Sequence, residues 1–214
     1  MTRSTLAAAV LFALCGYVAA DDPTVKVEDT PPPKEVAEPI RALLDTKALT
    51  VSDGKKAILT VWPRKSLETK AGDLSYAGLE ESAILGAVRF PEEWRDYRKQ
   101  KIKPGVYTLR LGLQPMDGDH MGTAPYNEFA LLIPADKDTK PGALDVKELH
   151  EQSKGSTTRK HPGLVLLFPN PKPGEKPVVE SKPQEHWVLS YGVPVKAGGA
   201  LGFSLVVVGS SMAE

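Results

Sequence analysis

The chain has 214 residues and carries 27 basic and 27 acidic side chains, so its formal net charge is zero. Because neutralisation of phosphates by Lys and Arg supplies most of the affinity for nucleic acids, this balance argues against a nucleic-acid partner. The length is sufficient for an ordinary hydrophobic core, and a single cysteine excludes an intrachain disulfide.

The first twenty residues have the layout of a cleavable secretory signal. Arg3 gives a positive start, residues 6–18 form a nearly unbroken apolar run, and Val-Ala-Ala precedes position 21. The run is shorter than the roughly 20 residues that a membrane span needs. A lipoprotein anchor on Cys15 is the alternative, although Leu14 stands where a small residue is expected. We therefore expect a periplasmic or extracellular protein whose mature chain has no transmembrane segment and no cysteine.

The next segment, residues 21–39, has five prolines and six acidic side chains but few large apolar ones. Such a composition buries too little surface to offset the entropy of ordering the chain. It predicts a disordered tether, followed by a single folded domain over residues 40–214.

Within that domain, an alternation with period two predicts antiparallel strands. Residues 48–62 indicate a hairpin with Asp53-Gly54 as a type I′ turn. In the strand predicted for residues 105–114, one face carries four large apolar residues, and Thr108, Arg110 and Gln114 lie on the other face, which predicts a half-buried strand. Further strands are expected over residues 82–89, 128–133, 163–168, 186–191 and 201–209.

Helix is scarce in this pattern. Asp145 as a cap, with Glu148 three residues later and Gly155 as a stop, predicts one short helix. Residues 91–100 are a weaker case, and the proline-rich residues 169–183 predict a long surface loop. The predicted fold is an all-β, antiparallel β-sandwich, jelly-roll-like, with one or two short helices.

The candidate site is the loop QPMDGDHMGTAPYNE, residues 114–128, because sandwiches build sites on loops at strand ends. Counted from Asp117 as position 1, Asp119, Gly122 and Glu128 stand at positions 3, 6 and 12 of a calcium-binding loop. Met121 replaces the oxygen ligand at position 5, and the flanking strands exclude an EF-hand. A calcium site in a strand-flanked loop remains one interpretation.

Two other interpretations of the loop stay open. Met116, His120 and Met121 provide two thioethers and an imidazole, which suit copper(I). Alternatively, the loop is an ordinary tight turn in which aspartates cap the backbone and glycine takes positive φ. The metal candidates are Asp117, Asp119, His120 and Glu128, and no catalytic set is recognised, so the sequence leans against an enzyme.

Other residues support two rival functions. His120 together with His150, His161 or His186 could hold an ion for a metal-dependent enzyme, because three imidazoles leave a position for an activated water. Trp94 and Tyr126 could form an exposed platform for a carbohydrate, and together with Met116 and Met121 they are the candidate ligand contacts.

The stretch KIKPGVYTLRLGLQPMDGDHMGTAPYNEFALLIPA, residues 101–135, resembles an uncharacterised family of secreted bacterial proteins. The resemblance implies a single exported domain and no particular activity. We therefore expect an exported binding or interaction module in the cell envelope, with an envelope protein or a carbohydrate as its partner.

Overall fold

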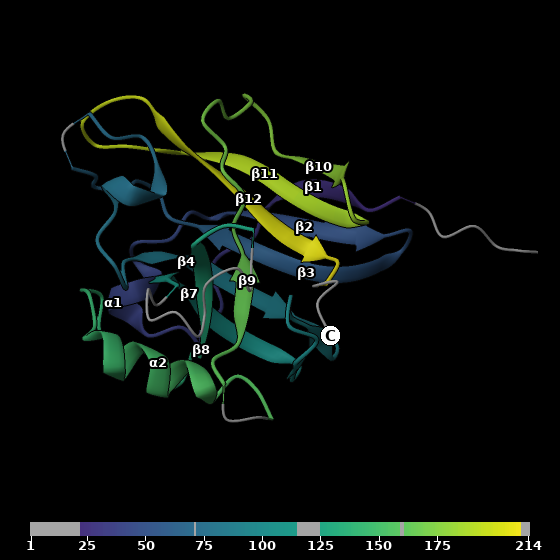
Figure 1. Ribbon diagram of the computed structural model, residues 1–214, viewed down its shortest axis with the longest axis horizontal. Coiled ribbons are helices and arrows are strands. Elements are labelled where there is room, and N and C mark those ends of the chain that lie inside the picture. Colours follow the sequence, from purple (N-terminus) through teal and green to yellow (C-terminus); the bar gives the residue numbers. More distant parts are fainter. Residues whose placement is uncertain (1–21, 71, 115–124, 159–160, 211–214) are drawn as a thin grey trace, which may run out of the picture.

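The computed structural model describes residues 22–70, 72–114, 125–158 and 161–210 (Figure 1). The described part is dominated by strands, with two α-helices and one 3-10 turn. In chain order the elements are β1 (Thr24–Asp29), α1 (Glu38–Arg41), β2 (Lys47–Asp53), β3 (Lys56–Pro63), η1 (Tyr76–Gly78), β4 (Ile84–Phe90), β5 (Trp94–Arg95), β6 (Lys101–Ile102), β7 (Gly105–Leu113), β8 (Glu128–Pro134), α2 (Val146–Lys154), β9 (Leu164–Leu166), β10 (Val178–Lys182), β11 (His186–Pro194) and β12 (Ala200–Val208).

The strands form antiparallel sheets, which confirms the predicted all-β, sandwich-like fold. A seven-stranded sheet has the order β1-β2-β3-β4-β7-β8-β9, and a three-stranded sheet has the order β10-β11-β12. Neighbours in the large sheet therefore follow one another along the chain, as in a meander, without the crossovers of a jelly roll. The amide of Phe168 donates to Ser204 O at 2.8 Å, so the chain after β9 links the large sheet to β12. At the opposite side, β1 approaches β10 (Figure 1).

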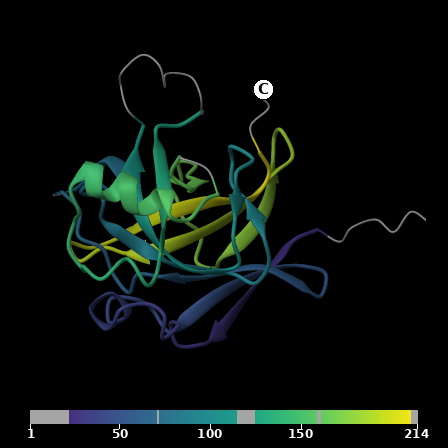
Figure 2. The ribbon, with the colours of Figure 1, turned by 90° about the horizontal axis from the view of Figure 1, so that it is seen from below.

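The main core lies between the two sheets, whose strands form separate layers in Figure 2. Alternate residues of β2, β3 and β7 meet alternate residues of β11 and β12, as the period-two pattern requires. Tyr191 and Phe203 stack within this core with their ring centroids 5.5 Å apart. The buried members from these strands include Val51, Val61, Leu109, Leu111, Leu189, Val193 and Leu205.

The N-terminal segment covers the outer face of the large sheet, and here the predicted tether is wrong. Residues 24–29 form β1, which pairs with β2 over six residues. Val36 and Ile40 are fully buried against Trp62, which donates its indole N–H to Thr30 O at 2.8 Å. This proline-rich segment is a covering segment, because Val36 and Ile40 bury their side chains on the outer face of the sheet, although Val27 stays exposed.

The helix predicted from its cap is confirmed as α2, which lies against β8 (Figure 1). The side chain of Asp145 accepts a hydrogen bond from the amide of Lys147 at 2.9 Å, as an N-cap does. Leu149 is fully buried against β8. The outer face of β7 is also buried, because Arg110 and Thr108 on that face are covered by residues 138–144, so the prediction of a solvent-facing side for that strand is wrong.

Three local predictions also need correction. The weaker helix, residues 91–100, is absent, and Trp94 begins the two-residue strand β5, which pairs with β6. Residues 178–182, predicted as part of a loop, form the edge strand β10, where the prolines lie outside the paired residues. The turn of the β2–β3 hairpin consists of Gly54 and Lys55, since Asp53 pairs with Lys56, so the predicted turn is displaced by one residue.

Candidate functional site

The structure describes only part of the predicted site. Glu128, Tyr126 and Trp94 are described, whereas five residues of the predicted loop lie outside the described residues: Met116, Asp117, Asp119, His120 and Met121. The calcium and copper interpretations of that loop stay predictions. Glu128 opens β8, opposite Leu113 at the end of β7.

Glu128 lies on a long groove built from adjoining hollows. The first has a volume of about 850 Å³ and lies between the residues around η1 and the open ends of β7 and β8. The second, about 200 Å³, shares Tyr76, Ala77 and Glu128 with the first. The third, about 690 Å³, shares residues 169–171 with the second and extends to β10. We call this continuous depression the η1–β10 groove.

Exposed aliphatic side chains gather along this groove. Leu113 lines the first hollow, Leu74 the second and Val178 the third. Each of these side chains is 40–42% exposed. Large exposed aliphatic groups that converge on one concave surface are typical of a site that a ligand or partner covers.

Tyr76 fixes the wall that the first two hollows share. Its hydroxyl donates to Phe168 O at 3.0 Å and accepts from the amide of Ser204 at 3.2 Å. These bonds tie η1 to the connection between the two sheets. Burial raises the pKa of the Tyr76 hydroxyl above its ordinary value of 10.0, and the Glu128 carboxylate adds to the rise. The hydroxyl therefore stays protonated at neutral pH and acts as a structural clamp.

A close backbone approach shapes the floor of the second hollow. Gly202 of β12 passes so near the segment 169–171 that a Cβ atom at this position would lie 2.1 Å from Asn170 O. The Asn170 side-chain amide donates to Phe203 O at 3.1 Å. Only glycine allows this approach, so the residue type at position 202 sets the depth of the groove.

The candidate aromatic contacts do not lie in one hollow. Trp94 stacks on Phe90, with ring centroids 4.7 Å apart, and donates its indole N–H to Val207 O at 3.0 Å. Tyr126 lines the third hollow of the groove and makes an edge contact with Phe168, with centroids 5.0 Å apart. Trp94 instead lines a separate hollow that shares no lining residue with the groove.

The described histidines lie in different environments. His150 is on α2, His161 is exposed, and His186 is buried at the start of β11. His186 packs between Tyr97 and Phe168, and its Nδ1 lies 3.1 Å from Pro183 O. Among the described residues, no group of three or more His, Cys, Asp or Glu side chains could hold a metal ion.

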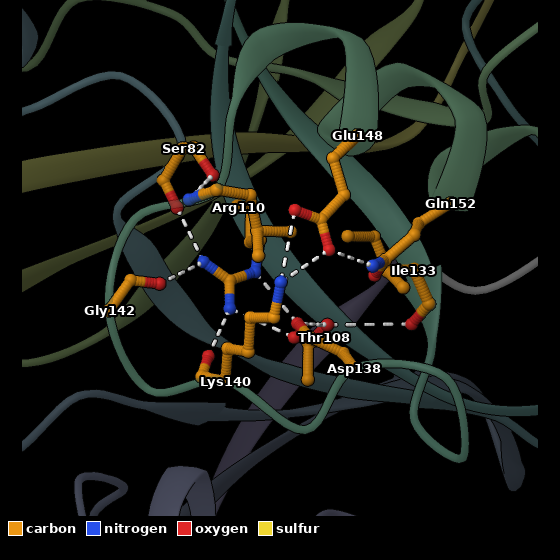
Figure 3. A network of polar contacts seen from close by, with 10 residues as sticks. Ser82, Thr108, Arg110, Ile133, Asp138, Lys140, Gly142, Glu148 and Gln152 are labelled. Atoms are coloured by element: carbon orange, nitrogen blue, oxygen red, sulfur yellow. Dashed lines mark hydrogen bonds and ion pairs between the residues drawn. The ribbon is translucent and has the colours of Figure 1, made fainter.

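A buried polar network on the outer face of β7 was missed by the sequence reasoning (Figure 3). Arg110 and Asp138 are both fully buried and form a two-pronged ion pair, Nε to Oδ2 at 2.7 Å and Nη2 to Oδ1 at 2.8 Å. The remaining guanidinium N–H groups donate to Ser82 O at 2.8 Å, Gly142 O at 2.9 Å and Lys140 O.

The network is structural because no donor is left for a ligand. A guanidinium has five N–H donors, and each of those of Arg110 has a protein acceptor (Figure 3). Thr108 adds a hydroxyl bond to Asp138 at 2.5 Å, and the amide of Leu144 donates to the Ser82 hydroxyl at 2.9 Å. The pair therefore holds residues 138–144 against β7.

Neither helix in the described part of the chain has the length and apolarity that crossing a bilayer requires. Comparison of the chain with protein-family models, with curated proteins and with solved structures finds no match.

Proposed function

We propose that this chain is an exported binding module and that its ligand occupies the η1–β10 groove. One observation carries the proposal: Leu74, Leu113 and Val178 come from three distant parts of the chain and expose aliphatic surface along one concave path. Aliphatic side chains that stay exposed to water in this way add nothing to the stability of the fold, because they are not buried. They provide affinity for whatever covers them.

The groove is largely preformed, which favours binding. Its walls combine η1 and neighbouring loops with the ends of β7 and β8 and with β10; Tyr76 clamps η1 in place, and the close approach of Gly202 to Asn170 fixes the floor. A rigid groove loses little conformational entropy when a ligand enters. Its polar groups, including Glu128 and Asn170, would orient the ligand.

Export is the second part of the proposal and depends on the residues before position 21. The charged start, the apolar run and the Val-Ala-Ala end support it. The test is N-terminal sequencing of the protein from the cells that produce it. We expect to find, outside the cytoplasm, a product that begins at Asp21. Leu11→Arg interrupts the apolar run and should leave the uncleaved chain in the cytoplasm. Recovery of the uncleaved parent in the cytoplasm would contradict export.

The binding function is tested with the purified protein on arrays of extended peptides and of glycans. Leu113→Glu places a charge in the groove, and Val146→Glu, on the exposed side of α2, is the matched control because the parent side chains are 40% and 41% exposed. We expect the peptides or glycans that bind the parent protein to lose binding to Leu113→Glu and to keep binding to Val146→Glu. Binding that survives both changes would place the ligand elsewhere.

A further inference from the structure

The charged side chains along the η1–β10 groove are separated by sign. Around the first hollow, Glu80, Glu81 and Glu128 form an acidic end, where Lys70 is the only cationic residue among the described residues of the lining. No ion-pair partner of these three glutamates is present among the described residues. Glu68 also lines this hollow, but Lys196 neutralises it at 2.5 Å.

The opposite end of the groove is basic. Lys172, Lys176 and Lys182 line the third hollow. Lys182 pairs with Glu180 at 2.8 Å, whereas Lys172 and Lys176 have no carboxylate partner within the described part of the chain. Both of these lysines are exposed, so their charges are available to a ligand.

Aliphatic rather than aromatic surface connects the two ends. Leu74 is 42% exposed at the second hollow, where Glu128 is the one charged residue that the structure describes in the lining. Sugar rings are usually held on exposed aromatic faces, but Tyr76 is only 6% exposed, and Tyr126 is half-buried and packs against Phe168. The lining therefore favours a polypeptide over a glycan.

We propose that the η1–β10 groove receives an extended polypeptide segment with a cationic half, a short apolar centre and an anionic half. This rests on the proposed binding function and names its partner class. The cationic half lies at Glu80 and Glu81, the apolar centre on Leu74, and the anionic half at Lys172 and Lys176. Complementary charges at both ends fix the direction of the segment, because the reversed segment would place like charges together.

The test uses fluorescently labelled peptides of twelve residues and one composition: four Lys or Arg, four Leu or Pro, and four Asp or Glu. One peptide runs from cationic to anionic, one runs from anionic to cationic, and one has the charges interspersed. Fluorescence anisotropy with the purified protein should show that one segregated peptide binds at least tenfold more tightly than the other two. The preference should shrink as salt is raised from 50 to 500 mM, because screening shortens the reach of exposed charges.

Charge-reversal variants assign the two ends. The double variant Glu80→Lys with Glu81→Lys should lower the affinity for the preferred peptide at least tenfold. The double variant Lys172→Glu with Lys176→Glu should do the same. Two double variants of exposed residues outside the groove serve as controls and should bind like the parent: Glu92→Lys with Glu93→Lys, and Lys34→Glu with Lys55→Glu.

The outcomes separate this proposal from the binding function. If all three peptides bind equally and Leu113→Glu abolishes their binding, the groove binds polypeptide without reading charge, and this proposal is overturned while the binding function stands. If only a glycan binds and Leu113→Glu abolishes it, the polypeptide partner is likewise overturned. If Leu113→Glu changes no binding at all, both proposals fail.

Discussion

The buried ion pair on β7 gives the sharpest test of how this fold is held together. Arg110→Met keeps much of the side-chain volume but removes all five N–H donors. Asp138 would then keep a buried charge without its cationic partner, and the carbonyls of Ser82, Lys140 and Gly142 would lose their donors. Breaking a buried pair on one side costs about 3–5 kcal/mol. That is a large share of the roughly 5–15 kcal/mol by which native domains are stable.

The assay is urea unfolding followed by tryptophan fluorescence, with the free energy extrapolated to water. Arg89→Met is the matched control, because Arg89 lies on the neighbouring strand β4 and makes a 3.1 Å pair with Glu35 whose partners are 45% and 56% exposed. An exposed pair of this kind contributes about 0–1 kcal/mol. The double variant Arg110→Met with Asp138→Leu should be less destabilised than the sum of its two single variants, because it leaves no uncompensated charge.

Two results would refute this reasoning. If Arg110→Met unfolds within about 1 kcal/mol of the parent, the network does not carry the stability assigned to a buried pair. If the free-energy losses of Arg110→Met and Asp138→Leu simply add in the double variant, the two side chains are not coupled, and the ion pair contributes no interaction energy to stability.

Three further predictions concern the cap, the clamp and the floor of the groove. Asp145→Ala removes the N-cap bond of α2 and should lower the free energy of unfolding by about 1 kcal/mol, measured by urea unfolding. Tyr76 has a raised pKa in the folded state, so its contribution to stability is complete below the unfolded pKa of about 10 and is lost as the pH rises above it. The free energy of unfolding should therefore fall less steeply between pH 9 and 11 in Tyr76→Phe than in the parent. Gly202→Ala drives a methyl group against Asn170 O and should destabilise by about 1–3 kcal/mol. Gly142→Ala, where a Cβ meets no atom within 4 Å, should cost far less, and equal losses for the two variants would contradict the close approach at the groove floor.

The sequence predicted the strands whose two faces differ in polarity and the helix whose ends are marked. Residues 201–209 alternate over a full strand, and β12 covers Ala200–Val208. Asp145 and Gly155 flank α2 at the expected positions. In both cases the signal is local, because periodicity and capping depend only on neighbours within a few residues.

The errors occur where distant parts of the chain overrule local composition. The segment 21–39 was predicted to be disordered because it is acidic and rich in proline, yet β2 pairs with β1 and Trp62 packs on Val36. Arg110 looks like a solvent-facing residue of an alternating strand. Its burial depends on Asp138, which stands 28 residues later in the chain and shows no periodic relation to it.

The sequence predicted only a small part of the candidate groove. Loops at strand ends pointed to residues 114–128, and Tyr126 and Glu128 do line the groove. The opposite walls, which Leu74 and residues 169–171 provide, lie far away in sequence and belong to segments without a period. The alternation of β7 assigned Leu113 to the core face, but the sheet ends there, and the side chain is left 40% exposed.

The saturated guanidinium of Arg110 also has a consequence for local opening of the fold. It ties Ser82, β7 and residues 138–144 through one buried group, so none of these segments can open without breaking the bonds of the others. Their amides, including that of Leu144 on the Ser82 hydroxyl, should therefore exchange hydrogen with solvent as one cooperative unit. Residues 171–176 along the groove lie outside this network, so their amides should exchange independently of the unit that Arg110 holds.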